Sequence, residues 1–315
     1  MSPFRRIPLL TLVTITAAGA IACGADEVKP TTTTSAGAAT PRPDSIEPVT
    51  PAARVTAAAV SAQYEDGEVA YREGRYEDAT AIFSAYVGRR PDNAFGHYML
   101  GLSAWKAGSL VDAVQSFDRA LALDSTHVKS LLNSSRVYLE LHEPAQALDR
   151  IHRAVAIDSA SGEAYRLLGR AFQVKGEADS AIDAYRRALV LDERDVWAMN
   201  NLGLLYIDLG QADEAIAPLA RAVELRGNSP VFRNNLGIAL EGTGHYALAR
   251  DAYEGVLEAD STYVKAAVSL ERVRPLVQES DSARLDLGDA AAGFAMQIRM
   301  WGQEIPAVPD SVPAE

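Results

Sequence analysis

Apolar positions along most of the chain recur at spacings of three, four and seven residues, which is the period of an amphipathic α-helix. Between residues 60 and 263 this pattern comes in pairs of half-repeats, each pair 34 residues long, without an insertion that shifts the phase. One alanine in the second half of each unit marks the period, at Ala79, Ala113, Ala147, Ala181, Ala215 and Ala249. We therefore expect an all-α chain in which units of two helices stack on one another.

Three further positions of the unit repeat in phase with this alanine. Position 8 is small, at Gly67, Gly101, Ser135, Gly169, Gly203 and Gly237. Position 24 is bulky, at Phe83, Phe117, Ile151, Tyr185, Leu219 and Tyr253. Position 15 is glycine at Gly74, Gly108, Gly176, Gly210 and Gly244, and glycine adopts a positive φ without steric cost. We expect the small residues to allow close helix approach, the bulky residue to fill the gap toward the next pair, and the glycine to form the turn.

This pattern resembles the tetratricopeptide repeat (TPR), and the resemblance covers 204 of the 315 residues. It implies a right-handed superhelical solenoid of six helix-turn-helix units over residues 60–263. The third unit departs most from the pattern but is expected to be helical. Its unusual signature residues are Ser134, Ser135, His142 and Pro144.

The remaining C-terminal segment divides into two parts. Residues 264–278 continue the first-helix pattern without a second helix, so they are predicted to form a capping helix. Residues 279–315 are predicted to be mostly disordered, with one short helix within 290–301. That helix would place Phe294, Ile298 and Trp301 on one face, at spacings of four and three residues.

The N-terminus has the features of an export signal. Arg5 and Arg6 precede an apolar stretch, residues 7–22, of 16 residues, which is short for a bilayer-spanning helix. The single cysteine, Cys23, follows directly, and this arrangement resembles the lipobox of bacterial lipoproteins. There, cleavage before the cysteine leaves it as an acylated N-terminus. The sequence departs from the lipobox at Ala20, where leucine is usual.

The lipobox resemblance implies a lipoprotein signal peptide over residues 1–22 and lipidation at Cys23. It also implies an exported protein, lipid-anchored to a bacterial envelope membrane on the periplasmic or outer-membrane side. Residues 23–58, rich in Thr, Ala and Pro, are predicted to be a disordered tether. The alternative is an ordinary signal peptide cut elsewhere, with Cys23 removed or idle.

Composition and motifs narrow the function classes. The net charge of −12 disfavours nucleic acid as a partner, and one cysteine allows neither an internal disulfide nor a cysteine-rich metal site. The five histidines are spread along the repeats without metal-ligand spacing, and no nucleotide-binding or hydrolase motif is present. We therefore expect no enzyme, no catalytic residue, no metal, no cofactor and no small-molecule substrate.

The TPR resemblance implies an inner groove lined by positions 2, 5, 6, 9, 12 and 13 of each unit. In TPR proteins that bind extended peptides, asparagine at position 6 often pairs with the ligand backbone. Arg166, Arg170 and Asn201 match part of the carboxylate clamp that grips a peptide C-terminus, whereas Val231 stands where a cation is expected. The candidate groove residues are Tyr98, Trp105, Asn133, Arg136, Arg166, Arg170, Trp197, Asn200, Asn201, Asn234 and Asn235.

Two functions remain open. The first is a membrane-anchored scaffold that binds peptides or protein partners in the cell envelope, during assembly, secretion or pilus-type biogenesis. The second is a structural or regulatory subunit of a membrane complex, held through its convex face or repeat ends. In either case the segment around Phe294, Ile298 and Trp301 could occupy the groove itself, and asparagine could simply tolerate a crowded inner face.

Overall fold

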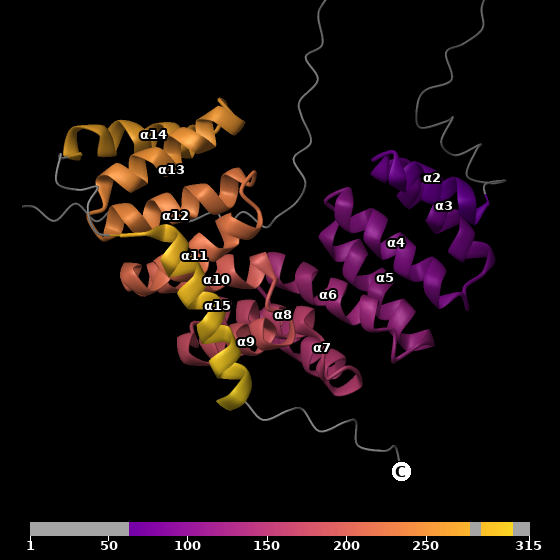
Figure 1. Ribbon diagram of the computed structural model, residues 1–315. Helices are drawn as coiled ribbons and strands as arrows, with labels where there is room; N and C mark the ends of the chain where they lie inside the picture. Colours follow the sequence, from indigo (N-terminus) through magenta and orange to yellow (C-terminus); the bar gives the residue numbers. More distant parts are fainter. Residues whose placement is uncertain (1–62, 278–284, 305–315) are drawn as a thin grey trace, which may run out of the picture. The chain divides into compact units, whose positions relative to one another are not determined.

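The computed structural model describes residues 63–277 and 285–304, which contain only helices and connecting turns (Figure 1). All of them belong to one compact unit, Val49–Glu315. The predicted signal peptide, Cys23 and the tether lie outside the described residues. No helix in the described ranges combines the length and apolar character needed to cross a bilayer.

The helices alternate between slightly shorter first helices and longer second helices. The first helices are α2 (Tyr64–Arg72), α4 (Ala94–Lys106), α6 (Val128–Glu140), α8 (Gly162–Lys175), α10 (Val196–Asp208), α12 (Pro230–Gly242) and α14 (Val264–Val273). The second helices are α3 (Tyr76–Arg89), α5 (Leu110–Leu123), α7 (Pro144–Ile157), α9 (Ala178–Leu191), α11 (Ala212–Leu225) and α13 (Tyr246–Ala259). Each second helix packs on its own first helix and on the next one, and each first helix from α4 to α12 contacts the following first helix. The predicted all-α stack of helix pairs is confirmed, whereas the count of six repeat units stays a prediction.

Within a pair, the small residue at position 8 lies against the bulky residue at position 24. A methyl group built on Gly169 would come within 2.6 Å of the Tyr185 ring, and one on Gly101 within 2.7 Å of the Phe117 ring. The bulky side chain therefore fills space inside its own pair. It also reaches toward the next pair, as expected, because the Tyr185 hydroxyl bonds to Asn201 on α10 and the Tyr253 hydroxyl to Ser269 on α14.

The turns inside the pairs use the left-handed conformation. Gly74, Gly108, Gly176, Gly210 and Gly244 have φ values between 73° and 84°. In the third unit His142 takes the same conformation at φ 57°, and its N–H still donates to the carbonyl oxygen of Leu139. The third unit is helical over α6 and α7, as expected, with a non-glycine residue in the strained position.

The C-terminal segment is more ordered than expected. The capping helix is α14, followed by a single 3-10 turn, η1 (Arg274–Leu276). The predicted short helix is α15 (Leu287–Glu304), 18 residues long, and it packs against the second helices α11 and α9 (Figure 1). Phe294, Ile298 and Trp301 are buried in that contact. The possibility that they occupy the groove was wrong, because their apolar face meets second helices rather than first helices.

Candidate functional site

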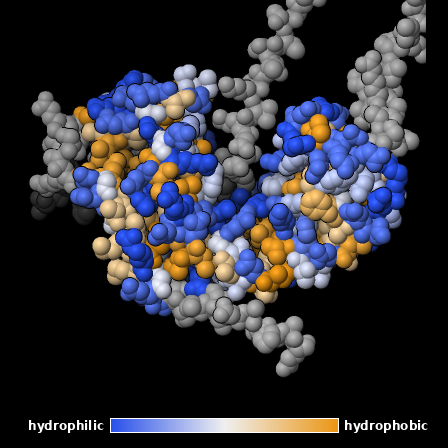
Figure 2. Space-filling model, turned by 45° about the vertical axis from the view of Figure 1, so that its right-hand side comes forward, coloured by the Kyte–Doolittle hydropathy of each residue, from blue (hydrophilic) through white to orange (hydrophobic). Residues whose placement is uncertain are grey.

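The candidate site is the first-helix face, defined as the surface formed by the predicted groove positions of α2, α4, α6, α8, α10, α12 and α14. Figure 2 shows hydrophobic residues reaching the surface as separate patches among hydrophilic ones on the face in view. On the first helices, the large hydrophobic side chains with the most exposure are Phe95 at 46%, Val264 at 72% and Val268 at 58%. The first-helix face therefore has an aromatic end and an aliphatic end.

The aromatic end joins three first helices. The Phe95 ring lies 5.9 Å from that of Tyr64 on α2 and 5.5 Å from that of Tyr98, and the Tyr98 ring lies 4.9 Å from that of His127. Burial raises the pKa of Tyr98, whose hydroxyl oxygen accepts a 3.2 Å hydrogen bond from the side-chain amide of Asn133. Tyr98 thus contacts the exposed Phe95, and Asn133 holds the Tyr98 ring in place. Both are predicted site residues.

His127 also begins α6. Its Nδ1 lies 2.7 Å from the Ser130 hydroxyl and accepts from the Ser130 backbone N–H, as a helix N-cap does. Burial lowers the pKa of His127. The cue in the sequence for this role is the position of His127 directly before a first helix, where Asn93, Ser161 and Asp195 cap α4, α8 and α10.

Two more predicted site residues bind across neighbouring repeats. The indole Nε1 of Trp105 donates to the Glu140 carboxylate at 3.0 Å. Arg136 donates to the Asn133 amide oxygen at 2.6 Å and forms an ion pair with Glu163. Burial lowers the pKa of Arg136, although its guanidinium stays charged because arginine titrates far above neutral pH. These side chains link α4, α6 and α8.

The predicted cations of the clamp have internal partners. Arg166 Nε donates to Asp195 Oδ2 at 2.8 Å, with the Asp195 side chain 10% exposed. Asp195 also caps α10 by accepting from the backbone N–H groups of Trp197 and Ala198. Arg170 likewise interacts within the chain. Arg166 therefore joins α8 to the start of α10, and its role toward a peptide carboxylate stays a prediction. The Trp197 ring is also used internally, edge-on to Phe232 at 5.0 Å.

The four asparagines of α10 and α12 form a linked row of side-chain amides. Asn234 Nδ2 donates to Asn235 Oδ1 at 3.4 Å, and Asn235 Nδ2 donates to Asn200 Oδ1 on the neighbouring helix at 2.8 Å. Asn200 Nδ2 then donates to Asn201 Oδ1 at 3.4 Å. Asn200, Asn234 and Asn235 are buried, with 3%, 3% and 7% exposure. The sequence predicted these residues for the site, but it could not predict that they bind one another.

The aliphatic end contains a depression of about 450 Å³ between α12 and α14. We call it the C-terminal depression. Its lining residues are Asn234, Ile238, Val264, Lys265, Val268, Ser269 and Arg272. Sequence reasoning named Asn234 for the site but missed Ile238, Val264 and Val268. The available signal was Val264 and Val268 at a spacing of four residues on a last helix with no following first helix to cover them.

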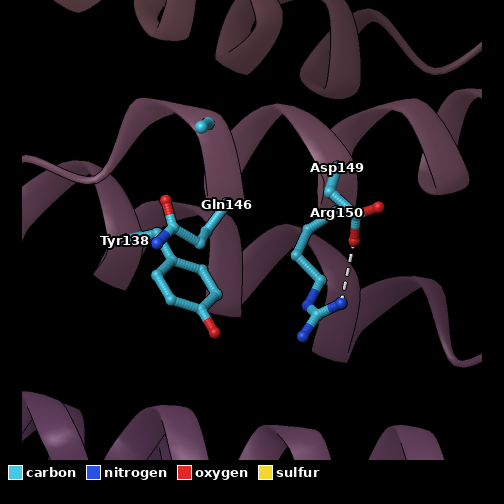
Figure 3. A pocket seen from close by; sticks show the side chains of 5 residues that line it. Tyr138, Gln146, Asp149 and Arg150 are labelled. Atoms are coloured by element: carbon cyan, nitrogen blue, oxygen red, sulfur yellow. Dashed lines mark hydrogen bonds and ion pairs between the residues drawn. The ribbon is translucent and has the colours of Figure 1, made fainter.

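A second depression of about 340 Å³ lies on α6 and α7 (Figure 3). Figure 3 shows Gln146, Asp149 and Arg150 on its walls beside the Tyr138 ring. The Arg150 guanidinium donates to Asp149 at 2.9 Å and to Asp118 at 2.7 Å, and its carbon lies 5.8 Å from the centre of the Tyr138 ring. Through these contacts Arg150 on α7 connects to Asp118 on α5 and to Tyr138 on α6.

The described residues contain no group of three or more His, Cys, Asp and Glu side chains that could hold a metal ion. His97 shows how such a side chain is used instead: it is 9% exposed, and its Nε2 lies 3.1 Å from the Pro91 carbonyl oxygen.

Proteins that are built from stacked pairs of helices form a class, the helical-hairpin repeat proteins. Sequence models of that class match this chain. A model of the tetratricopeptide repeat matches residues 46–94, 64–128 and 200–264, and a second TPR model matches residues 170–210. The chain belongs to the TPR family, whose members are scaffolds for protein–protein interaction.

Individual curated proteins match only part of this chain, at low sequence identity. DnaJ homolog subfamily C member 7 of Homo sapiens is 29% identical over 96 residues, which are 29% of this chain and 19% of that protein. The Mus musculus protein matches to the same extent. The chain thus spans about a fifth of the length of the curated relatives it matches.

Solved structures share the fold. TTC0263, a thermophilic TPR protein of Thermus thermophilus, has a TM-score of 0.50 at 23% identity, covering 57% of this chain and 98% of its own. The pilF protein of Pseudomonas aeruginosa has a TM-score of 0.53 at 19% identity, covering 69% and 97%. At these identities the similarity is one of fold.

Proposed function

We propose that this chain is a non-enzymatic scaffold of the bacterial cell envelope, exported and held at a membrane through a lipid on Cys23. It binds a protein partner through its first-helix face during assembly, secretion or pilus-type biogenesis. Family membership supports the scaffold role, and the lipobox-like sequence around Cys23 supports the anchor.

The observation that carries the proposal is the exposed Phe95. A 46% exposed phenylalanine leaves apolar area in water, which a partner can cover. Its neighbours Tyr64, Tyr98 and His127 lie within 6.4 Å, ring centre to ring centre, and hold it in place. A preorganised aromatic side chain is the kind of anchor that dominates protein interfaces.

The test is a photocrosslinking comparison in membranes of the cells that make the protein. Benzoylphenylalanine replaces Phe95 in one variant and Val111 in a matched variant, because Val111 is 60% exposed on the second helix α5. We expect a partner to be crosslinked from position 95 and not from position 111. Crosslinking from position 111 alone would reject the first-helix face.

A second candidate function is that of a structural or regulatory subunit of a membrane complex. Such a subunit binds the complex through its convex face or repeat ends rather than through the first-helix face. Met296 and Met300, 60% and 53% exposed at a spacing of four residues on α15, favour this reading. Both project from the helix whose other face packs on α9 and α11, so they form an apolar strip on the side away from those helices. A crosslinker at Met300 that captures the partner, with none captured from Phe95, would select this second function.

A further inference from the structure

One face of α15 is apolar and uncovered. Its opposite face packs on α9 and α11 through Phe294, Ile298 and Trp301. On the uncovered face Met296 and Met300 are 60% and 53% exposed, and their spacing of four residues places them one helical turn apart. Exposed thioether side chains in a row leave apolar area in water, which a second surface can remove.

The two halves of this face differ in size. Gly288 and Ala292, in the N-terminal half, are exposed at the same four-residue spacing that separates Met296 from Met300 in the C-terminal half. When two such helices lie antiparallel, the large half of one meets the small half of the other. Met296 then stands over Ala292 of the second copy, and Met300 stands over its Gly288, as knobs fit into holes between packed helices.

The charged residues of the face follow the same pairing. Asp289 and Arg299 are both exposed, and they are ten residues apart on α15. This is about 15 Å along the helix axis, so the two cannot pair within one chain. In the antiparallel arrangement Asp289 lies opposite Arg299 of the second copy, because this pair and both methionine pairs are centred on Phe294. A single register therefore matches large with small and acid with base.

Other occupants match the face less closely. In a parallel pair each methionine would meet its own copy, and Asp289 and Arg299 would each lie beside a like charge. A membrane surface is disfavoured because the net charge of the chain is −12, and anionic lipid headgroups repel it. The self-complementary register thus selects a second copy of this chain, related to the first by a twofold axis.

We propose that two copies of this chain associate through the uncovered faces of α15, antiparallel and centred on Phe294. The methionines of each copy cover the small residues of the other, and two symmetry-related ion pairs between Arg299 and Asp289 flank them. This inference goes beyond the proposed scaffold function and does not depend on it, because α15 packs on second helices whereas the candidate site lies on first helices.

The size of the contact sets its strength. The 18 residues of α15 make a helix about 27 Å long. One face of it can bury only part of the roughly 800 Å² per partner that a standard protein interface uses. We therefore expect a weak pair, with the chain monomeric at micromolar concentration and paired at submillimolar concentration.

Sedimentation equilibrium of the full chain in density-matched detergent measures the association. We expect the average mass to rise from that of one chain toward that of two as the concentration increases. Ala292→Leu fills the space for Met296 and should weaken association about tenfold or more. The matched change Gln297→Leu, at an exposed position a quarter turn away from Met296, should not. A mass that stays at one chain, or equal association of the two variants, would overturn the proposal.

A charge exchange tests the register. Arg299→Asp should weaken association about tenfold, because two exposed ion pairs become two repulsions. Adding Asp289→Arg in the same chain should restore association, and thermal melts at micromolar concentration check that the variants fold equally well. Since the two positions cannot pair within one chain, the restored association comes from contact between copies. A double variant that associates no better than Arg299→Asp alone would show that the register is wrong.

Disulfide formation reports the orientation. Chains with Met296→Cys and chains with Ala292→Cys, tagged to differ in size, should form a mixed crosslinked dimer on oxidation at submillimolar concentration. Chains with Met300→Cys should not crosslink to one another, because the antiparallel register holds these positions about 18 Å apart along the axis. The original chain, with Cys23 alone, is the control. Crosslinking between Met300→Cys chains without the mixed dimer would indicate a parallel pair and overturn the proposal.

Photocrosslinking from Met300 in membranes separates this proposal from the functions above. A product that contains two copies of the chain supports the pair. Capture of a different protein alone would overturn the pair and select the structural or regulatory subunit, while the crosslinking test at Phe95 decides the scaffold function independently.

Discussion

Gly169 has no side chain, and its small size allows α8 and α9 to pack closely. Tyr185, fully buried, fills the space where a Cβ would lie. We therefore expect Gly169→Ala to lower the free energy of unfolding by about 1–3 kcal/mol, as overpacking of a core does. Urea denaturation measures the change.

The control for that substitution is Gly293→Ala. Gly293 lies inside α15 with no atom within 4 Å of the position that an added methyl group would take, and alanine favours a helix over glycine by about 0.5–1 kcal/mol. This variant should be at least as stable as the original chain. A Gly169→Ala variant of equal stability would contradict the close contact with Tyr185.

His127 makes the stability of the chain depend on pH. Burial, together with the nearby Lys129 charge, lowers its folded-state pKa, while Asp124 acts in the opposite direction. A lowered folded-state pKa means that the unfolded chain binds the proton more readily. The stabilisation is therefore complete above the unfolded pKa, about 6.5, and is lost as pH falls through the folded pKa.

The substitution that isolates this effect is His127→Asn. Asparagine keeps an N-cap acceptor, as Asn93 does at the start of α4, but it does not titrate. Thermal melts at pH 7.5 and 5.5 should show a smaller difference for the variant than for the original chain. Equal pH dependence in the two proteins would exclude His127 as the group responsible.

The turn between α6 and α7 is the strained element of the repeat array. His142 has φ 57° where five other units have glycine, and a left-handed residue with a Cβ costs about 1–2 kcal/mol. Glycine removes that strain but makes the unfolded chain more flexible, at about 0.4–1 kcal/mol. His142→Gly should thus stabilise the protein by about 0.5–1 kcal/mol in urea denaturation. A loss of stability would show that the histidine side chain makes a compensating contact.

The helix α15 is held on α9 and α11 mainly by the buried side chains of Phe294, Ile298 and Trp301. Trp301 is 8% exposed, and the Arg186 guanidinium lies 5.1 Å from the centre of its ring. Trp→Ala changes in a core typically cost about 3–5 kcal/mol. Because α15 is a separate terminal helix, we expect Trp301→Ala to detach it rather than to unfold the array.

Amide hydrogen exchange tests that expectation. Faster exchange in α15, and in the parts of α9 and α11 beneath it, should appear without a matching change in α4 and α5. The exposed Met300→Ala on the same helix is the control and should leave exchange unchanged. Uniformly faster exchange along all helices would show instead that α15 stabilises the whole array.

For the whole molecule, the predicted anchor is the point to test. If Cys23 carries the lipid, Cys23→Ser should move the protein from the membrane fraction to the soluble fraction, because the acyl chains supply the membrane affinity. Fractionation followed by immunoblotting measures this, with the original chain as control. A Cys23→Ser protein that stays membrane-bound and uncleaved would show that residues 1–22 act as the anchor themselves.

The sequence predicted the features that depend on residues close to one another along the chain. The small residue at Gly169 and the glycine turn at Gly176 recur in phase, so the helix pairs and their turns followed from periodicity. The docking of α15 on α9 and α11 did not, because an apolar face alone does not specify which distant helices will cover it. The same limit applies to Arg166, whose partner Asp195 caps the next first helix, α10, and to Asn234, whose side-chain oxygen has no donor among the described residues.

The contact of α15 with α9 and α11 has a mechanical consequence. The N-terminal pairs, α2 to α5, make their main contacts with adjacent helices, so under tension they can peel away one after another. The segment from α9 to α11 is crossed by a helix from near the end of the chain, which must slide off before those helices can separate. A single molecule pulled from both ends should therefore extend first in small steps and last in one larger, more abrupt rupture. Removing residues 285–315 should convert that rupture into further small steps.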